Sequence, residues 1–522
     1  MQPNLPPEDS HTEEKKQEMK NSIGRAIIVA LAVLLQVGWL VGLFTKLAAY
    51  STLLNTITMV AAVLVALSVY GSHMNAAYRI SWIVLILVFP LLGVPIYLAF
   101  GRESSTALMR RRYARVDSTL QDVLPEDAAV WEALNAQDDD LALQARYLQR
   151  QGFPLFRNTD VDFYGDTVEA LEAQKQALRS AEHFIFMEYH AIEDAAAWRG
   201  IEEILREKAA AGVEVRVFYD DMGSIGFISK PFAKRLQREG IQCRVFNPLL
   251  PVLNVFMNNR DHRKITVVDG RVGFTGGYNL ADEYFNYTHP YGEWKDSGLR
   301  LTGDAVHSLT RIFLQMWNAT QPTPEDPTPY LPKVAYQAQQ QGFVLPYSDT
   351  PLDEECVGEN VYLNLVNSAR RYVYLATPYL ILDDEMQAAL MLAAKNGVDV
   401  RLVTPGIPDK KLVFRVTRSY YARLARAGVR IFEFSPGFVH AKQAVADDRV
   451  AVCGTINLDF RSLYLHFENG CWYCGCPAVQ KMRADFDALF PRCAEVTEQY
   501  ANRRSLALRG GDLFLRLFSP LM

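Results

Sequence analysis

The feature that most constrains the fold of this chain is an internal repeat. Three short stretches rich in β-branched residues occur in each half of the sequence, in the same order and at nearly the same spacing. They are HFIFMEYH from His183, GVEVRVFYDD from Gly212 and GIQCRVFNP from Gly240, and then YVYLATPYL from Tyr372, GVDVRLVTPG from Gly397 and GVRIFEFSPG from Gly428. Charged segments of helical periodicity separate these stretches. The pattern predicts an α/β fold made of two homologous halves.

Each half carries the same polar motif after its third predicted strand. The pattern is H-x-K-x4-D followed by G-[GT]-x-N. Its residues are His262, Lys264, Asp269 and Asn279 in the first half, and His440, Lys442, Asp447 and Asn457 in the second. With 9 histidines, 54 basic and 59 acidic residues among 522, about 0.1 such matches are expected by chance. Two matches in register with a repeat therefore indicate a functional site.

The residue types of the motif suit the chemistry of a phosphate ester. Residues two apart on a strand project to the same face, so each histidine and its lysine lie together. An imidazole can attack phosphorus or carry a proton, and an ammonium group neutralises phosphate oxygens. The amides of Asn279 and Asn457 can donate to the same oxygens without adding charge. The motif predicts a phosphoryl-transfer site that needs no metal and no cofactor.

The two motif aspartates have a structural interpretation beside the catalytic one. Asp269-Gly270 and Asp447-Asp448 stand where a tight turn between two strands is expected. Aspartate favours such turns because its side chain bonds to nearby backbone N–H groups. We therefore expect Asp269 and Asp447 to form turns and support a strand, and we keep them as candidate catalytic residues.

Three uncharged apolar runs occupy the first hundred residues. They lie at residues 26–44, 53–70 and 80–100. Each is long enough to cross the hydrocarbon core of a membrane as a helix, and the first is too long for the core of a signal peptide. We expect a retained membrane anchor of two or three helices at residues 23–104, behind a polar tail at residues 1–22. Pro90, Gly93 and Pro95 interrupt the third run, which predicts a kinked span or a re-entrant hairpin.

Basic residues flank the apolar runs on both sides. Lys15, Lys16, Lys20 and Arg25 precede the first run, and Arg102, Arg110, Arg111, Arg112 and Arg115 follow the third. Cytoplasmic flanks of membrane helices are enriched in Lys and Arg, and three crossings would separate these two groups. One run can lie in the interface instead of crossing. We expect the arginine-rich side, and with it both catalytic halves, to be cytosolic.

Composition narrows the classes of function. A formal net charge of −5 argues against a protein that coats nucleic acid. Seven cysteines are an odd number and few for this length, which favours a reducing compartment over a disulfide framework. Cys471, Cys474 and Cys476 form CWYCGC. We interpret them as part of a buried strand, because no fourth metal ligand lies nearby in the sequence.

The remaining boundaries follow from local composition. We expect a basic linker at residues 105–150, the first catalytic half at 151–320, a Pro-rich linker at 321–350, the second catalytic half at 351–500 and an amphipathic C-terminal segment at 501–522. The Pro-rich stretch QPTPEDPTPYLP suits an extended connection. The C-terminal segment has two interpretations, an interfacial helix or a segment packed on the domain.

The two motifs resemble those of the phospholipase D superfamily. The longer segments HRKITVVDGRVGFTGGYNLADEY and HAKQAVADDRVAVCGTINLDFRSL, with the anchor, resemble the bacterial cardiolipin synthases. The third apolar run, FYDDMGS from Phe218 and the closing LFSPLM extend the resemblance over nearly the whole chain. It implies two phospholipase D-like halves behind a multi-pass anchor in the cell membrane of a bacterium. The implied reaction moves a phosphatidyl group from one phosphatidylglycerol to another, with release of glycerol, through a phosphohistidine.

The resemblance also implies roles for single residues. His262 is the nucleophile, and His440 acts as acid and then as base. Asp296 orients the histidine of the first half and Glu468 that of the second. Two segments depart from the family: His466-Phe467-Glu468 stands where members often read NFE, and Trp294–Gly298 stands in place of a WRDTH-like segment. Histidines without a lysine two residues later, such as His190 and His466, are assigned no chemistry.

Three alternatives remain open at this stage. A membrane-bound hydrolase of the same superfamily would use water as the acceptor. A non-enzymatic membrane scaffold would bind anionic lipid through the same basic residues. A transferase using a nucleotide-activated lipid is disfavoured, because the chain has no Gly-rich phosphate-binding loop. The expected partners are phosphatidylglycerol and membrane lipids, not nucleic acid.

Overall fold

The structure is a computed structural model. It describes residues 31, 34–39, 41–43, 45–46, 52–72, 74–101, 107–120, 123–124, 126–229, 231–248, 258–323, 325–333, 335–502 and 516. The predicted polar tail, part of the first apolar run with the basic residues before it, and the C-terminal segment apart from residues 501, 502 and 516 lie outside the described residues. Arg102 lies outside them as well.

The first half is an α/β unit. Its elements are β1 (Thr159–Tyr164), α8 (Thr167–Arg179), β2 (Phe184–Tyr189), α9 (Ala196–Ala210), β3 (Glu214–Asp220), α10 (Phe232–Arg238), β4 (Gln242–Phe246), β5 (Lys264–Val268), β6 (Val272–Gly276), the 3-10 helix η5 (Asp282–Phe285), β7 (Glu293–Lys295), β8 (Gly298–Gly303) and α11 (Val306–Thr320).

The second half repeats the main βαβ order, with β13 placed before the motif strands and with additional elements at its end. Its elements are β9 (Phe343–Asp349), α12 (Val357–Ser368), β10 (Tyr372–Ala376), α13 (Asp384–Lys395), β11 (Asp399–Pro405), α14 (Lys411–Arg426), β12 (Arg430–Phe434), β13 (Gly437–Val439), β14 (Gln443–Ala446), β15 (Val450–Gly454), α15 (Phe460–Tyr464), β16 (Glu468–Cys474), α16 (Pro477–Leu489), η7 (Phe490–Arg492), β17 (Cys493–Glu495) and α17 (Thr497–Ala501).

The sheets of the two halves have the same topology. The strand order is β1-β8-β6-β5-β2-β3-β4 in the first sheet and β9-β16-β15-β14-β10-β11-β12-β17 in the second. In each, three parallel strands follow the βαβ rule and continue into antiparallel strands that carry the motif. The prediction of two homologous α/β halves is confirmed.

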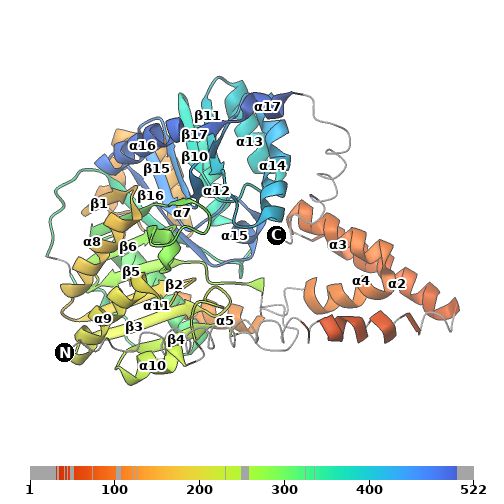
Figure 1. Ribbon diagram of the computed structural model, residues 1–522, viewed down its shortest axis with the longest axis horizontal. Coiled ribbons are helices and arrows are strands. Elements are labelled where there is room, and N and C mark those ends of the chain that lie inside the picture. Colours follow the sequence, from red (N-terminus) through yellow and green to blue (C-terminus); the bar gives the residue numbers. More distant parts are fainter. Residues whose placement is uncertain are drawn as a thin grey trace, which may run out of the picture.

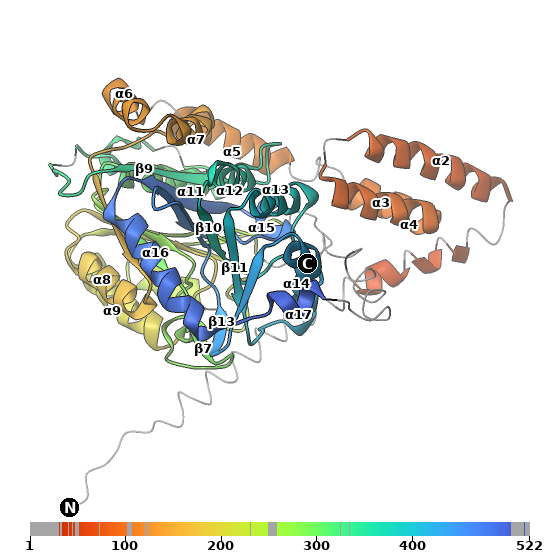
Figure 2. The same ribbon diagram turned by 90° about the horizontal axis from the view of Figure 1, so that it is seen from above.

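The two sheets lie face to face around a shared core (Figures 1 and 2). Helices α11 and α16 lie between them and contact strands of both sheets. On α11, Phe313 stacks on Phe186 of β2 with ring centroids 4.6 Å apart, and on α16 Phe486 meets Tyr374 of β10 at 5.9 Å. Helices α8 and α9 cover the outer face of the first sheet, and α12 to α14 that of the second. Burial of these apolar faces joins the halves into one body.

The segments expected as linkers are structured. Residues 105–150 contain α5 (Ala107–Leu120), α6 (Ala128–Gln137) and α7 (Asp139–Arg150). Helix α5 packs on α11, where the Tyr113 hydroxyl donates to Gln315, and α7 packs on β16, where the Trp472 indole donates to Gln144. The Pro-rich stretch holds the 3-10 helix η6 (Thr328–Tyr330), and β9 begins within the expected 321–350 linker. The second half therefore starts earlier than composition indicated.

The cysteine-rich segment lies in the core. Cys471 and Cys474 are buried in β16, and Cys476 is buried at the start of α16. All three contribute to the apolar clusters on the faces of the second sheet. The interpretation of CWYCGC as a core strand is confirmed.

The N-terminal helices stand to one side of the body (Figure 1). They are α2 (Thr52–Tyr70), α3 (Ala76–Val88), α4 (Pro90–Ile96) and the π-helix η1 (Tyr97–Gly101). Among the described residues, no helix has both the length and the apolar character of a membrane span. The predicted transmembrane anchor thus has no support from the described helices.

The third apolar run is a helical hairpin and not a single span. Pro90 cannot donate to the helix before it, so α3 ends at Val88 and α4 begins anew. The chain folds back, which brings the Tyr97 ring to 5.3 Å from the Trp82 ring. A Cβ at Gly93 would lie 2.6 Å from the Ile86 backbone, so only glycine allows α4 to pack this closely on α3. The run therefore folds back on itself, and its re-entry into a membrane stays a prediction.

The N-terminal hairpin contacts the second half beside α15. The Asn75 side chain donates to the Tyr464 hydroxyl at 2.8 Å, and the Tyr78 ring lies edge-on to Phe460 and Tyr464. Elsewhere α2 and residues 76–89 present an apolar surface to solvent. Its exposed large side chains include Ile57, Met59, Val60, Val63, Leu64, Leu67, Ile80, Leu87, Val88 and Phe89.

The two motif aspartates hold the turns at the far ends of the motif strands. Asp269 and Asp447 adopt positive φ of 51° and 56°, and each carboxylate accepts three backbone N–H bonds. The donors are Glu182, His183 and Phe184 for Asp269, and Arg370, Arg371 and Tyr372 for Asp447. At about 3.3 Å per residue, a whole strand separates each aspartate from its histidine by roughly 20 Å. The structural interpretation matches this geometry.

This arrangement predicts a stability defect for Asp269→Asn and Asp447→Asn. An amide has one acceptor oxygen, so each variant loses at least one charge-assisted bond at a cost of about 3 kcal/mol. The thermal denaturation midpoint of the purified protein in detergent should fall by roughly 3 °C.

Asp448→Asn is the matched control, because the Asp448 carboxylate accepts from the side chains of Tyr372 and Arg371 and from no backbone N–H of the described residues, so it should shift the midpoint less. If Asp269→Asn or Asp447→Asn loses activity while its thermal midpoint is unchanged, that aspartate has a catalytic role and not a structural one.

Candidate active site

Two short backbone connections join the halves at the site. Strand β7 of the first half pairs in parallel with β13 of the second. Directly beyond this pairing, the His440 N–H donates to the Lys295 carbonyl at 2.7 Å. In the equivalent place, the His262 N–H donates to the Phe467 carbonyl at 2.9 Å. Each motif histidine is therefore bonded to the residue that precedes a carboxylate of the other half.

The carboxylates pair with the histidines across the two halves. His262 Nδ1 lies 2.9 Å from Glu468 Oε2, and His440 Nδ1 lies 2.6 Å from Asp296 Oδ2. All four residues are buried. The expectation that Asp296 serves the first-half histidine and Glu468 the second is wrong, because the crossing backbone connections exchange the partners. Both carboxylates do lie at the site.

A single position explains why the motif reads G-[GT]-x-N. In the first half, Gly277 donates its N–H to Ser297, and a Cβ there would lie 2.1 Å from Asp296 Oδ1. Because Gly277 has no Cβ, the Asp296 carboxylate can lie directly against the backbone at this position. The equivalent residue of the second half is Thr455, whose hydroxyl donates to Glu468 Oε2. Glycine makes room for one carboxylate, and threonine binds the other.

The two imidazoles are held neutral. Burial, helped by Lys264, His190 and His466, keeps the pKa of His262 well below its ordinary value. Burial and the Lys442 charge lower the pKa of His440 to about 3, although Asp296 opposes the shift. A neutral imidazole that donates from Nδ1 keeps a lone pair on Nε2.

The two carboxylates differ in their electrostatics. Burial would raise the pKa of Asp296, yet His440, Lys442 and the Ser297 N–H hold it below its ordinary value. Burial raises the pKa of Glu468 well above its ordinary value, with Lys264 opposing. An ionised Asp296 therefore stabilises an imidazolium at His440 better than Glu468 does at His262.

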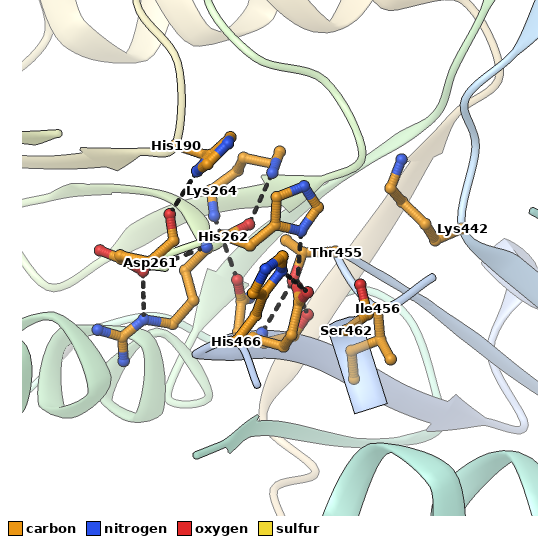
Figure 3. A network of polar contacts seen from close by, with 12 residues as sticks. His190, Asp261, His262, Lys264, Lys442, Thr455, Ile456, Ser462 and His466 are labelled. Atoms are coloured by element: carbon orange, nitrogen blue, oxygen red, sulfur yellow. Dashed lines mark hydrogen bonds and ion pairs between the residues drawn. The ribbon is translucent and has the colours of Figure 1, made fainter. Parts of the chain in front are cut away.

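The motif lysines flank the histidines. Figure 3 shows His262 with Lys264 on one side and Lys442 on the other. Lys264 Nζ donates to the His262 carbonyl at 2.6 Å, and Lys442 Nζ donates to the His440 carbonyl. Burial lowers the pKa of Lys264 to about 8 and that of Lys442 to about 7. The binding of an anion favours the protonated, charged form of both lysine amines.

The two motif asparagines are buried beside the site but differ in their contacts. Asn279 accepts from the Ala191 N–H at 3.1 Å and donates to the Tyr284 hydroxyl at 2.8 Å. It thereby connects the end of β2 to a ring that lies 5.2 Å from the His440 ring. Asn457 Oδ1 is buried without a hydrogen-bond partner among the described residues. Phosphate binding by either amide stays a prediction.

The sequence analysis assigned no role to several residues that lie near the site. His190 and His466 flank His262, with ring centroids at 4.9 Å and 5.6 Å. Trp294 and Tyr284 line His440 at 5.3 Å and 5.2 Å. Three of these residues could have been predicted from their closeness to the motif residues in the sequence. Tyr284 lies five residues after Asn279, Trp294 lies two before Asp296, and His466 lies two before Glu468. Only His190, at the end of β2, depended on the three-dimensional fold.

Comparison with known proteins places both halves of this site in one superfamily, that of phospholipase D. The family described as "Cardiolipin synthase, PLD-like domain" matches residues 175–317 and 362–490, one match in each half. The family described as "Phospholipase_D-nuclease N-terminal" matches residues 58–102. A crystal structure of phosphatidylserine synthase from Haemophilus influenzae covers 73% of this chain and 99% of its own, with 13% identity and a TM-score of 0.55, a likeness of fold.

Relatives narrow the assignment within the superfamily. A cardiolipin synthase of Halalkalibacterium halodurans is 32% identical over 489 residues, covering 93% of this chain and 95% of its own. Cardiolipin synthase 2 of Bacillus cereus is 33% identical over 467 residues, covering 89% and 90%. An uncharacterized protein of Streptococcus mutans is 41% identical over 453 residues, covering 87% and 98%. This chain belongs to the cardiolipin synthase family.

The pKa of Lys442 predicts the alkaline side of the pH profile. A group with a pKa of about 7 loses its charge as the pH rises, and kcat/KM reports the free enzyme. We expect kcat/KM for phosphatidylglycerol to fall above pH 7 by roughly 100-fold once the amine is neutral. Neutral detergent micelles keep lipid charge from shifting the local pH.

Lys442→Met is the control for this profile. It removes the amine, so its kcat/KM should be low and should lack the same descending limb. If kcat/KM of Lys442→Met still falls above pH 7, the fall is caused by deprotonation of another group.

Proposed function

We propose that this chain is a phosphatidyltransferase that joins two phosphatidylglycerol molecules to form cardiolipin and releases glycerol. The observation that carries the proposal is the exchanged pairing of His262 with Glu468 and of His440 with Asp296 in one buried site. Such a site offers two imidazoles with fixed tautomers and two ammonium groups. These are the groups that a two-step phosphoryl transfer requires.

In the first step, His262 Nε2 attacks the phosphorus of the donor lipid. Its Nδ1–H donates to Glu468, whose pKa is raised by burial, and Lys264 and the Thr455 hydroxyl bound to that carboxylate oppose the rise. As the bond from phosphorus to the glycerol oxygen breaks, His440 gives its proton to that oxygen. The products are free glycerol and a phosphatidyl group bonded to His262. Lys264 and Lys442 neutralise the phosphate oxygens in the transition state.

In the second step, His440 takes the proton of the terminal hydroxyl of a second phosphatidylglycerol. The resulting oxygen attacks phosphorus, the bond to His262 breaks, and cardiolipin forms. His440 thus alternates between acid and base. The low pKa of Asp296 supports this role, because an ionised carboxylate stabilises the imidazolium in each half-reaction. The negative charge of a bound phosphodiester raises the pKa of His440 from its value in the empty site.

We assign the two asparagines to the phosphate group. Asn457 lies two residues beyond Thr455 and so close to the carboxylate of the nucleophile, where its amide NH2 group can donate to a phosphate oxygen. Asn279 has its amide bonded to Tyr284 and acts through that ring on the His440 side. The reaction so derived uses no metal and no cofactor.

The apolar surface of the N-terminal helices supports a lipid substrate. Helices α2 and α3 expose large aliphatic side chains, including Val63, Leu67 and Leu87. We infer that this surface enters the cell membrane of a bacterium and that the catalytic halves lie on the cytosolic side. The contact between Asn75 and Tyr464 then connects the membrane surface to the segment that leads to Glu468.

Product analysis tests the reaction against hydrolysis. Membranes containing the protein are incubated with phosphatidylglycerol labelled separately in its glycerol headgroup and its acyl chains. We expect headgroup label in free glycerol and acyl label in cardiolipin. Acyl label in phosphatidic acid would instead identify a hydrolase, and absence of both products with retained lipid binding would identify a scaffold.

The two histidines should differ in kind when replaced. His262→Ala removes the attacking atom, so both the covalent adduct and transfer should be abolished. His440→Ala removes the proton donor and should lower the rate by about 10² to 10⁴. A donor lipid whose leaving group needs no proton should still load His262 in that variant.

Rapid quenching followed by mass spectrometry of the two motif peptides locates the adduct. An adduct on His440 in the unmodified protein would reverse the two roles and leave the reaction class as proposed.

A further inference from the structure

A second imidazole stands beside the first motif histidine. His262, His466 and Glu468 each offer one ligand atom, and these three atoms lie within 4.8 Å of one another. His262 Nδ1 is 2.9 Å from Glu468 Oε2, and His466 Nδ1 is 3.6 Å from Glu468 Oε1. One carboxylate thus faces two imidazoles, one with each oxygen. Figure 3 shows the His466 ring directly beside His262.

Part of this cluster has no hydrogen-bond partner among the described residues. Both ring nitrogens of His466 and Oε1 of Glu468 are buried and unpaired. The Glu468 side chain is fully buried, and that of His466 is 11% exposed. A buried polar atom without a partner costs about 1 to 3 kcal/mol, so it is retained where it has another use. Because one ligand atom each from His262, His466 and Glu468 lie within 4.8 Å of one another, these atoms can share one bound ion.

The donor set identifies the class of ligand. Two imidazole nitrogens and one carboxylate oxygen form the three-residue set that holds zinc in open sites, where a fourth position stays free for water. Magnesium and calcium prefer oxygen ligands and are disfavoured by two imidazoles. Lys264 and Lys442 oppose a dication here, which limits the affinity without changing this order of preference.

We propose that His262, His466 and Glu468 bind a zinc-class transition-metal ion and that this ion reversibly inhibits the enzyme. The inhibitory part rests on the proposed function. An ion at Nδ1 displaces the proton of His262 from Nδ1 to Nε2, and Nε2 then has no lone pair with which to attack phosphorus. The ion also takes Glu468 away from its role as hydrogen-bond acceptor. A chelator therefore restores activity in a zinc-treated sample.

Metal binding is measured on the full-length protein in detergent, freed of metal and without lipid. Zinc chloride is titrated by calorimetry, and cobalt chloride is titrated by visible absorption. We expect one zinc ion per chain and a cobalt spectrum of nitrogen and oxygen ligands. His466→Asn places an amide where the resembling family often has one, and it should weaken binding roughly tenfold or more.

His183→Asn is the matched control, since His183 is exposed at the far end of β2 and should leave binding unchanged. If His466→Asn folds poorly, His466→Gln replaces it in the zinc titration. Its thermal midpoint must lie near that of the unmodified protein. Equal zinc affinity in all of these proteins would refute the site.

Inhibition is measured as glycerol release from phosphatidylglycerol in micelles. Low micromolar zinc should inhibit the unmodified protein and His183→Asn, and excess chelator should restore both. His466→Asn should need a roughly tenfold higher concentration. Equal inhibition of His466→Asn would assign the effect to zinc bound by lipid headgroups and overturn the inhibitory role. The binding titration contains no lipid, so its result stands whether the protein proves to be a transferase or a hydrolase.

Discussion

The site depends on two backbone hydrogen bonds that cross between the halves. The His440 N–H bonds to the Lys295 carbonyl, and the His262 N–H bonds to the Phe467 carbonyl. Because the next residue in each acceptor segment is Asp296 or Glu468, these bonds place each carboxylate at the imidazole of the other half. The shared core of α11 and α16 brings the two sheets to the distance at which the bonds form. Neither half contains a complete histidine–carboxylate pair.

Burial then sets the electrostatics of what these bonds bring together. Removing the site from water lowers the pKa of both histidines and both lysines, so the empty site holds less positive charge than its composition indicates. A bound phosphodiester reverses this tendency, because its negative charge favours the protonated lysines and an imidazolium at His440. The full positive charge of the site therefore develops with the substrate and not before it.

The sequence predicted much of this molecule, for reasons that can be stated residue by residue. A repeat that places His262 and His440 in register requires two similar sheets, and the i, i+2 spacing puts Lys264 and Lys442 beside them. The turns at Asp269 and Asp447 follow from local rules, whereas the backbone N–H groups that bond to their carboxylates come from distant segments at the start of β2 and β10. The pairing of Asp296 and Glu468 was predicted wrongly, because distance along the chain does not show which half a loop enters. The helices at 105–150 were missed for a similar reason, since they are stabilised by packing on α11 and β16.

The exchanged pairing also limits how the two halves can diverge. In most duplicated proteins one copy can accumulate substitutions while the other maintains the function. Here a change at Glu468 acts on the histidine of the first half, and a change at Asp296 acts on that of the second. Gly277 and Thr455 accommodate these two carboxylates by different means, so the halves differ even at this position while each carboxylate still serves the histidine of the other half. The duplication has made the halves dependent on each other, and selection acts on them as one unit.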